Sequence, residues 1–297
     1  MFTLTVLGNN GPYPAKGGAC SGYLLQYDGT KILLDLGSGS LANLTSVLSA
    51  ELESIDAIIL THLHSDHISD LSVFRYAIFR SGNSVGAGVA ALKIPLYCPP
   101  GPQMEYEALC SYDQFDVHPI TESLVLKLNG LAVSFAPMPH SYPAFAVSVI
   151  TDEFDKPTIS AAAVTSDASA TAAAASAAAL TTATGGCEYY PKFVYTGDTA
   201  WNLDLIQFCE GADLLLADAN LISQDKLSGK PVQHLTAEEC GIIAAEAGVT
   251  RLLLTHFTPG ADISRRVAEA RAGAQKVLGR SDSLLVEAAK ILTSYEI

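Results

Sequence analysis

The chain has 297 residues, of which 49% are hydrophobic and 16% charged, and this composition excludes general disorder. One layered α/β domain can absorb the whole length, so we expect a single domain over residues 1–297. With 17 basic and 31 acidic residues, the formal net charge of −14 disfavours a large polyanionic partner such as tRNA, because binding to a phosphate backbone needs clustered Lys and Arg.

The start of the chain bears on where the protein resides. Residues 2–8 alternate like a strand and are not preceded by the basic segment of a signal peptide, so we expect a cytoplasmic protein. Every apolar run is shorter than the roughly 18 to 20 residues that a membrane-spanning helix needs, so we expect no membrane partner. The six cysteines have no short paired spacing, and we expect them to be buried free thiols.

Four short apolar runs bounded by Gly, Pro and Asp predict strands at 2–8, 22–27, 31–36 and 55–61. The last run leads directly into His62-Leu63-His64-Ser65-Asp66-His67. A helix is predicted to start near Ile68, so this motif occupies a strand-to-helix turn, where several side chains can converge.

The motif at residues 62–67 predicts metal binding. His62 and His64 can point toward one metal, while Asp66 and His67 can reach a second. Chance clustering on a surface loop is the alternative, but three of the seven histidines lie in this motif beside a carboxylate. Such ligands suit zinc, with manganese or iron as alternatives, and a pair of these metals can polarise an ester and supply hydroxide near neutral pH.

The later elements predict the architecture. Asn129-Gly130, between runs 124–128 and 131–136, is the strongest hairpin signal, because both residues tolerate the positive φ of a type I′ turn. Further strands are expected at 192–197, 212–217, 250–255, 283–287 and 290–295, and helices at about 200–209, 236–247 and 262–278. Two halves of this kind predict a layered α/β fold, a four-layer α-β-β-α sandwich.

One segment differs in composition from the rest. From Ser160 to Thr184 nearly every residue is Ala, Ser or Thr. Such a stretch has too little large apolar surface to offset its ordering entropy, so we expect a flexible or surface-draped insertion at about 157–188. Partial helicity and a role in gripping the substrate are the alternatives, because Ala favours helix and the insertion lies between two candidate ligands, His140 and Asp198.

The motif resembles the H-x-H-x-D-H signature of the metallo-β-lactamase superfamily, and the resemblance implies the metallo-β-lactamase fold. It also implies further ligands in order along the chain, which Pro139-His140, Gly197-Asp198 and Thr255-His256 match. On this basis the first metal would take His62, His64 and His140; the second would take Asp66, His67 and His256; and Asp198 would bridge both. Asp35 matches a family position that orients a ligand without binding metal.

The segment Lys230–Glu239, followed by a helix and the strand that leads to His256, resembles the ribonuclease Z branch. There, a His before that helix assists departure of the leaving group, which implies His234 as general acid, with Asp66 helping to orient the hydroxide. A surface His that caps the helix beside Thr236 is the alternative. His64 stands where the redox di-iron branch carries Glu, which favours hydrolysis over electron transfer.

The substrate expectation departs from tRNA. Ribonuclease Z grips tRNA with a basic, Gly- and Pro-rich arm between the third and fourth motifs, whereas this interval holds the Ala/Ser/Thr tract and only two lysines. We expect a phosphodiesterase with two divalent metals that acts on a small or nucleotide-like substrate. Processing of tRNA 3′ ends, hydrolysis of a lactone or thioester, and a non-catalytic binding module are the alternatives. The apolar composition leaves room for a homodimer interface, and His118 is expected in a loop.

Overall fold

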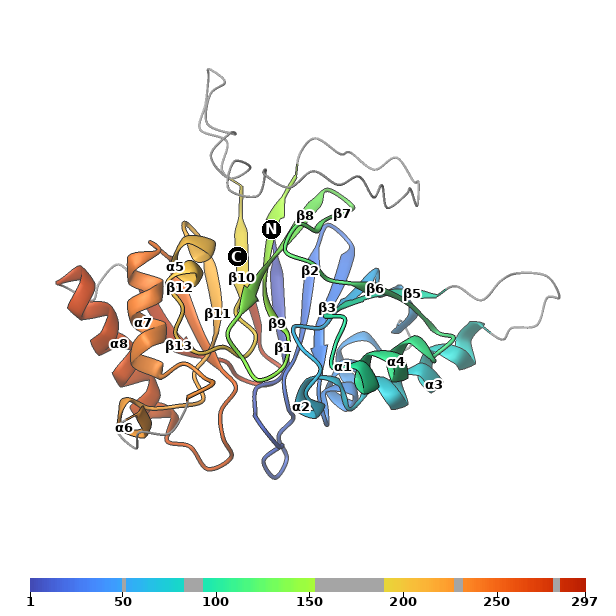
Figure 1. Ribbon diagram of the computed structural model, residues 1–297, viewed down its shortest axis with the longest axis horizontal. Coiled ribbons are helices and arrows are strands. Elements are labelled where there is room, and N and C mark those ends of the chain that lie inside the picture. Colours follow the sequence, from blue (N-terminus) through green and yellow to red (C-terminus); the bar gives the residue numbers. More distant parts are fainter. Residues whose placement is uncertain (50–51, 83–92, 153–189, 227–231, 280–283) are drawn as a thin grey trace, which may run out of the picture.

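The computed structural model describes residues 1–49, 52–82, 93–152, 190–226, 232–279 and 284–297. Two seven-stranded sheets pack face to face with helices on both outer sides, which confirms the four-layer α-β-β-α sandwich (Figure 1). The insertion expected at about 157–188 lies outside the described residues, and so does Cys187. Within the described part, each helix is too short or too polar to cross a membrane.

The first sheet has the strand order β14-β1-β2-β3-β4-β5-β6. Its strands are β1 (Thr3–Gly8), β2 (Gly22–Tyr27), β3 (Thr30–Leu36), β4 (Ala57–Ile59), β5 (Ile94–Cys98), β6 (Phe115–Pro119) and β14 (Ser294–Glu296). Its helices are α1 (Ser40–Leu48), the 3-10 turn η1 (Leu52–Ser54), α2 (Ser65–Ile68), α3 (Leu71–Gly82) and α4 (Gln103–Cys110). Alternate residues of β1, β2 and β3 face these helices, as the period of two along a strand requires.

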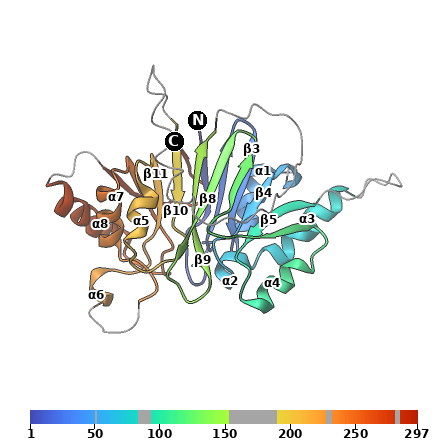
Figure 2. The same cartoon turned by 45° about the horizontal axis from the view of Figure 1, so that its top comes forward.

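The second sheet has the order β13-β12-β11-β10-β9-β8-β7. Its strands are β7 (Val125–Leu128), β8 (Leu131–Met138), β9 (Ala144–Thr151), β10 (Lys192–Tyr195), β11 (Leu214–Asp218), β12 (Arg251–Thr255) and β13 (Leu285–Ala288). Its helices are α5 (Asp204–Cys209), α6 (Ser223–Lys226), α7 (Ala237–Glu246) and α8 (Ile263–Leu278). Figure 2 shows this group of helices on one outer side and α1 to α4 on the other.

The core consists of three apolar clusters, one between the two sheets and one beneath each group of helices. The cluster between the sheets joins side chains of β1, β2 and β3 to side chains of β8, β9 and β10. Because these strands are apolar on both faces, each contributes to two clusters at once. The candidate site residues follow from the ends of these packed strands.

Several local expectations differ from the structure. The strands expected at 283–287 and 290–295 lie in different sheets, since β13 joins β12 in the second sheet and β14 joins β1 in the first. His118 lies on strand β6 rather than in a loop, where it contacts Asp116 and stacks on Tyr97. Cys110 is exposed, whereas the other described cysteines are buried free thiols. The hairpin at Asn129-Gly130 is confirmed, with φ of 47° and 79°.

Candidate dinuclear metal centre

The predicted metal ligands and Asp35 lie at or just beyond the carboxyl ends of strands, whereas His234 lies in the segment before α7. Asp35 ends β3, the motif at residues 62–67 follows β4, and His140 follows β8. Asp198 and His256 follow β10 and β12. β3 is parallel to β4, and β10, β11 and β12 are parallel to one another, so in each sheet these carboxyl ends share one edge. The structure brings these residues together from both sheets.

The first group consists of His62, His64, His140 and Asp198. His64 Nδ1 lies 3.0 Å from His62 Nε2 and 3.1 Å from His140 Nε2, and Asp198 Oδ2 lies 3.7 Å from His62 Nε2. Ligand atoms about 2.0–2.1 Å from a tetrahedral ion are separated by about 3.4 Å, so these spacings suit one cation. Burial lowers the pKa of all three histidines, which favours the neutral imidazole that binds metal.

The second group consists of Asp66, His67, His256 and again Asp198. Asp198 Oδ1 lies 3.2 Å from His67 Nε2, and Asp198 Oδ2 lies 3.2 Å from His256 Nε2. Asp66 Oδ2 lies 3.1 Å from His256 Nε2. All four side chains are buried. Asp198 therefore belongs to both groups: Oδ2 lies near His62 of the first group and His256 of the second, and Oδ1 lies near His67 of the second.

Two observations show that these residues fit divalent cations. His67 Nε2 and Asp198 Oδ1 are fully buried and face each other at 3.2 Å, yet neither makes a hydrogen bond within the described chain. An unsatisfied buried polar atom costs about 1–3 kcal/mol, which coordination of an ion would offset. Position 11 also has to be glycine, because the Cβ of any other residue there would lie 1.9 Å from His256 Nε2 and would clash with the nitrogen that faces the candidate cation.

The histidine nitrogens that point away from the groups are held by other parts of the chain. His67 Nδ1 donates to Asp35 Oδ2 at 2.8 Å, and His140 Nδ1 donates to the backbone oxygen of Gln233 at 3.0 Å. His62 Nδ1 lies 3.1 Å from Thr61 Oγ1, and that hydroxyl donates to Asp35. Partners of this kind fix the ring orientation and the tautomer, so that Nε2 is left to face the ion.

Asp35 is a buried hub for these contacts. Besides His67, it accepts hydrogen bonds from the backbone and side chain of Thr61 and from Tyr195 Oη at 2.9 Å. Its backbone has φ of 54°, an uncommon conformation for a residue other than glycine. Asp35 therefore contacts the candidate ligand His67 but belongs to neither of the two candidate metal groups.

His234 lies next to the second group. Its Nδ1 is 2.9 Å from Asp218 Oδ2 and 3.8 Å from Asp198 Oδ2, and its ring stacks on that of His256 with centroids 5.2 Å apart. Burial opposes protonation of His234, but the charge and hydrogen bond of Asp218 outweigh it and raise the pKa. Thr236 and Glu239 form the capping box of α7, so His234 does not cap that helix.

Sequence reasoning did not identify Asp218 as a site residue. It is completely buried at the end of β11, and its Oδ1 also lies 3.4 Å from His256 Nδ1. The available signal was an acid at the end of a buried strand whose parallel neighbours both lead to candidate ligands. Asn220 was missed as well; its side-chain amide donates to the backbone oxygen of His256 at 3.1 Å.

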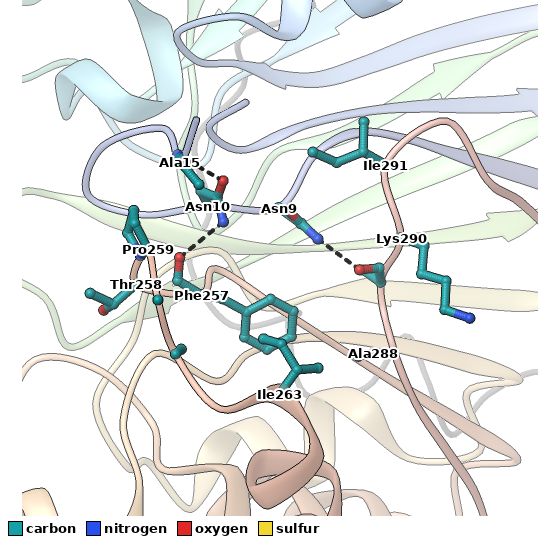
Figure 3. A pocket seen from close by; sticks show the side chains of 13 residues that line it. Asn9, Asn10, Ala15, Phe257, Thr258, Pro259, Ile263, Ala288, Lys290 and Ile291 are labelled. Carbon is teal, nitrogen blue, oxygen red and sulfur yellow. Dashed lines mark hydrogen bonds between the residues drawn. The ribbon is translucent and has the colours of Figure 1, made fainter. Parts of the chain in front are cut away.

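A cavity of about 460 Å³ lies beside the centre, between the loops after β1, β12 and β13. Figure 3 shows its walls, where Asn10 Nδ2 donates to the backbone oxygen of Phe257 and Asn9 Nδ2 donates to that of Ala289. Gly11, which packs against His256, directly follows Asn10. The asparagines therefore tie together three loops, two of which carry Gly11 and His256.

Comparison with known proteins agrees with this geometry. The β-lactamase superfamily domain matches residues 30–257. The chain is 30% identical over 255 residues to the probable metallo-hydrolase YhfI of Bacillus subtilis, covering 86% of each protein. It is 27% identical over 287 residues to the ribonuclease Z of Ignicoccus hospitalis, covering 90% of this chain and 91% of that one.

The fold agrees with a solved structure over its whole length. The crystal structure of YhfI from Bacillus subtilis superimposes with a TM-score of 0.73 and 25% identity, covering 99% of this chain and 98% of that chain. The shared fold, the sequence match and the two His/Asp groups lead to one assignment. The chain belongs to the metallo-β-lactamase superfamily, as a metal-binding hydrolase related to YhfI and ribonuclease Z.

Proposed function

We propose that this chain is a phosphodiesterase that acts on a small or nucleotide-like substrate with two divalent ions, preferably zinc. The observation that carries the proposal is the contact between His234 and Asp218 at the edge of the second group. An alkoxide leaving from a phosphoester needs a proton, and a lactone or thioester needs less help. A histidine beside the centre whose pKa is raised by Asp218 therefore favours phosphoester chemistry.

In this proposal, seven residues would bind the two ions and His234 would supply a proton. His62, His64 and His140 would hold one ion, Asp66, His67 and His256 the other, and Asp198 both. Bound there, the ions would polarise the phosphoryl group and lower the pKa of water. Asp66 would help to orient the attacking water. Asp218 holds His234 through Nδ1, so the proton for the leaving oxygen comes from Nε2.

The net charge supports a small substrate, and the relatives support a phosphodiester. The net charge of −14 disfavours a long polyanion, while the relative named ribonuclease Z supports chemistry at a phosphodiester. A substrate held chiefly by two cations needs few basic side chains around it. Lys127 is the one lysine between His118 and Asp152, so the described chain around His140 is poor in cations.

A leaving-group series tests this proposal. Zinc-loaded protein is assayed on aryl phosphodiesters, from bis(p-nitrophenyl) phosphate to analogues whose leaving phenolates are more basic. We expect His234→Ala to lower kcat by about 10²- to 10⁴-fold on the most basic leaving group and by less on p-nitrophenolate, because general acid catalysis matters most for poor leaving groups.

The matched control is His118→Ala, which removes a histidine on β6 that lies outside the metal groups and should retain full activity. Zinc content is measured for both variants and should equal that of the unaltered protein. Absence of turnover by zinc-loaded protein, or a His234→Ala effect that does not vary along the series, contradicts the proposal. Preferential cleavage of precursor tRNA or of a lactone would assign the centre to those substrates instead.

A further inference from the structure

Two buried tyrosines lie between the sheets near the candidate centre. Tyr23 on β2 belongs to the first sheet, and Tyr195 on β10 belongs to the second. Their rings meet edge to face with centroids 5.0 Å apart, and neither side chain is more than 1% exposed. Phenylalanine would pack equally well in this apolar cluster, so the two hydroxyls need a separate explanation.

Each hydroxyl reaches a residue of the opposite sheet. Tyr23 Oη shares a hydrogen bond of 2.6 Å with Thr255 Oγ1, at the end of β12 in the second sheet. Tyr195 Oη donates at 2.9 Å to Asp35 Oδ2, on β3 in the first sheet. Burial raises the pKa of both tyrosines far above the ordinary value, so both hydroxyls stay protonated.

Both bonds end next to a histidine of the second group. Thr255 directly precedes His256, which has φ of 60°. Asp35 accepts the hydrogen bond of His67 Nδ1 through Oδ2, the same oxygen that accepts from Tyr195. His67 is carried by the first sheet and His256 by the second, with ring centroids 5.3 Å apart. The spacing of these two ligands therefore depends on how the sheets are held against each other.

We infer that Tyr23 and Tyr195 are positioning residues whose crossed hydrogen bonds fix the spacing of His67 and His256 for the second cation. The inference rests on the proposed metal roles of those histidines, and it does not depend on which ester is hydrolysed. Removal of either hydroxyl should weaken the second cation and leave the first group intact, because within the described chain neither hydroxyl bonds to His62, His64 or His140. Asp35 is linked to His62 only indirectly, through Thr61.

The test is a titration of metal-free full-length protein with Zn²⁺ and with Co²⁺. For Tyr23→Phe and for Tyr195→Phe we expect the dissociation constant of the second ion to rise about tenfold to a hundredfold, as when other partners of metal ligands are lost. The first ion should bind as before. The visible absorption of Co²⁺ in the second site should change, because the bands report the ligand geometry.

Tyr295→Phe is the matched control. Tyr295 is also buried in the cluster between the sheets, but among the described residues its hydroxyl bonds only to backbone atoms of Lys290 and Ala288. It should leave both metal affinities unchanged. The inference is overturned if Tyr23→Phe and Tyr195→Phe bind the second ion as the unaltered protein does, or if Tyr295→Phe weakens it equally.

Thr255→Val provides a second route if Tyr23→Phe fails to fold. It removes the partner of the Tyr23 hydroxyl while it keeps the shape of the side chain. We expect it to weaken binding of the second ion as Tyr23→Phe does. The double variant Tyr23→Phe/Thr255→Val should bind the second ion no more weakly than either single variant, because all three lack the same hydrogen bond. Additive losses in this cycle contradict the inference. Loss of phosphodiesterase activity with intact metal binding would instead contradict the proposed function alone.

Discussion

The two histidine groups differ in the protons that they hold without metal. In the second group, burial opposes protonation of His256, but Asp198 and hydrogen bonds to Asp218 and Asp66 raise its pKa to about 10. His67 is raised in the same way, against its burial, by Asp198 and Asp35. In the first group burial lowers the pKa of every histidine. A cation must therefore displace protons from one group only.

This asymmetry predicts the proton balance of metal binding. At pH 7 the ion that enters the second group should release about two protons and the ion that enters the first group almost none. Calorimetric titrations with zinc in two buffers of different ionisation enthalpy measure the release. His64→Ala and His256→Ala, which each remove a ligand of one group, separate the two events. Equal release by both ions contradicts the prediction.

Much of the candidate site could be predicted from the sequence, residue by residue. The spacing within residues 62–67 places four polar side chains at one turn, and the structure brings His140, Asp198 and His256 to the same place. Asp218 and Tyr195 could not be identified in this way. Each acts through contact with another side chain, Tyr195 across the two sheets and Asp218 with the segment before α7, and neither contact follows from a local pattern.

At the scale of elements, the start of α7 supports the candidate general acid. Its capping box at Thr236 and Glu239 lies two residues after His234. Ala237 N donates to Leu221 O, and Cys240 Sγ contacts the backbone oxygen of Asp218. The first turn of α7 is therefore bonded to the segment that carries the partner of His234.

Thr236→Ala should consequently affect both stability and catalysis. Loss of the cap should cost about 1 kcal/mol of unfolding free energy in urea. Displacement of His234 should lower kcat, by up to about a hundredfold for a shift near 1 Å. Asp262→Ala is the control, because Asp262 caps α8 by accepting from Arg265 N. It should cost similar stability and keep full kcat; a similar kcat for both variants contradicts the argument.

Local patterns predicted most elements of the second half, but not how its last strands pair. The strand expected near 290–295 is β14, which pairs with β1 across almost the whole chain, Leu4 opposite Tyr295. No local periodicity encodes a partner so distant, whereas the hairpin at Asn129-Gly130 is encoded by its own two residues. Turns that depend on neighbouring residues can therefore be predicted from the sequence, whereas the order of distant strands is set by the packing of the whole domain.

At the scale of the whole molecule, the candidate centre lies across the two sheets. Asp66 and His67 come from the first sheet, and Asp198 and His256 come from the second. A cation bound to all four joins the halves of the sandwich, so its binding free energy adds to the free energy of unfolding. At a free metal concentration a hundredfold above Kd this addition is about 2.7 kcal/mol.

Metal removal should therefore lower Tm, and the drop should depend on pH. For a protein of this size, 2.7 kcal/mol corresponds to a fall of about 5–10 °C at neutral pH. Without metal, the ion pairs of His67 and His256 partly replace it. Because these pKa values are raised on folding, that stabilisation is complete below about pH 6.5 and is lost as pH rises toward 10. Thermal unfolding with and without a chelator, from pH 6.5 to 9, should show a widening gap. A gap that narrows as pH rises would mean that the apo centre is not held by protonated histidines.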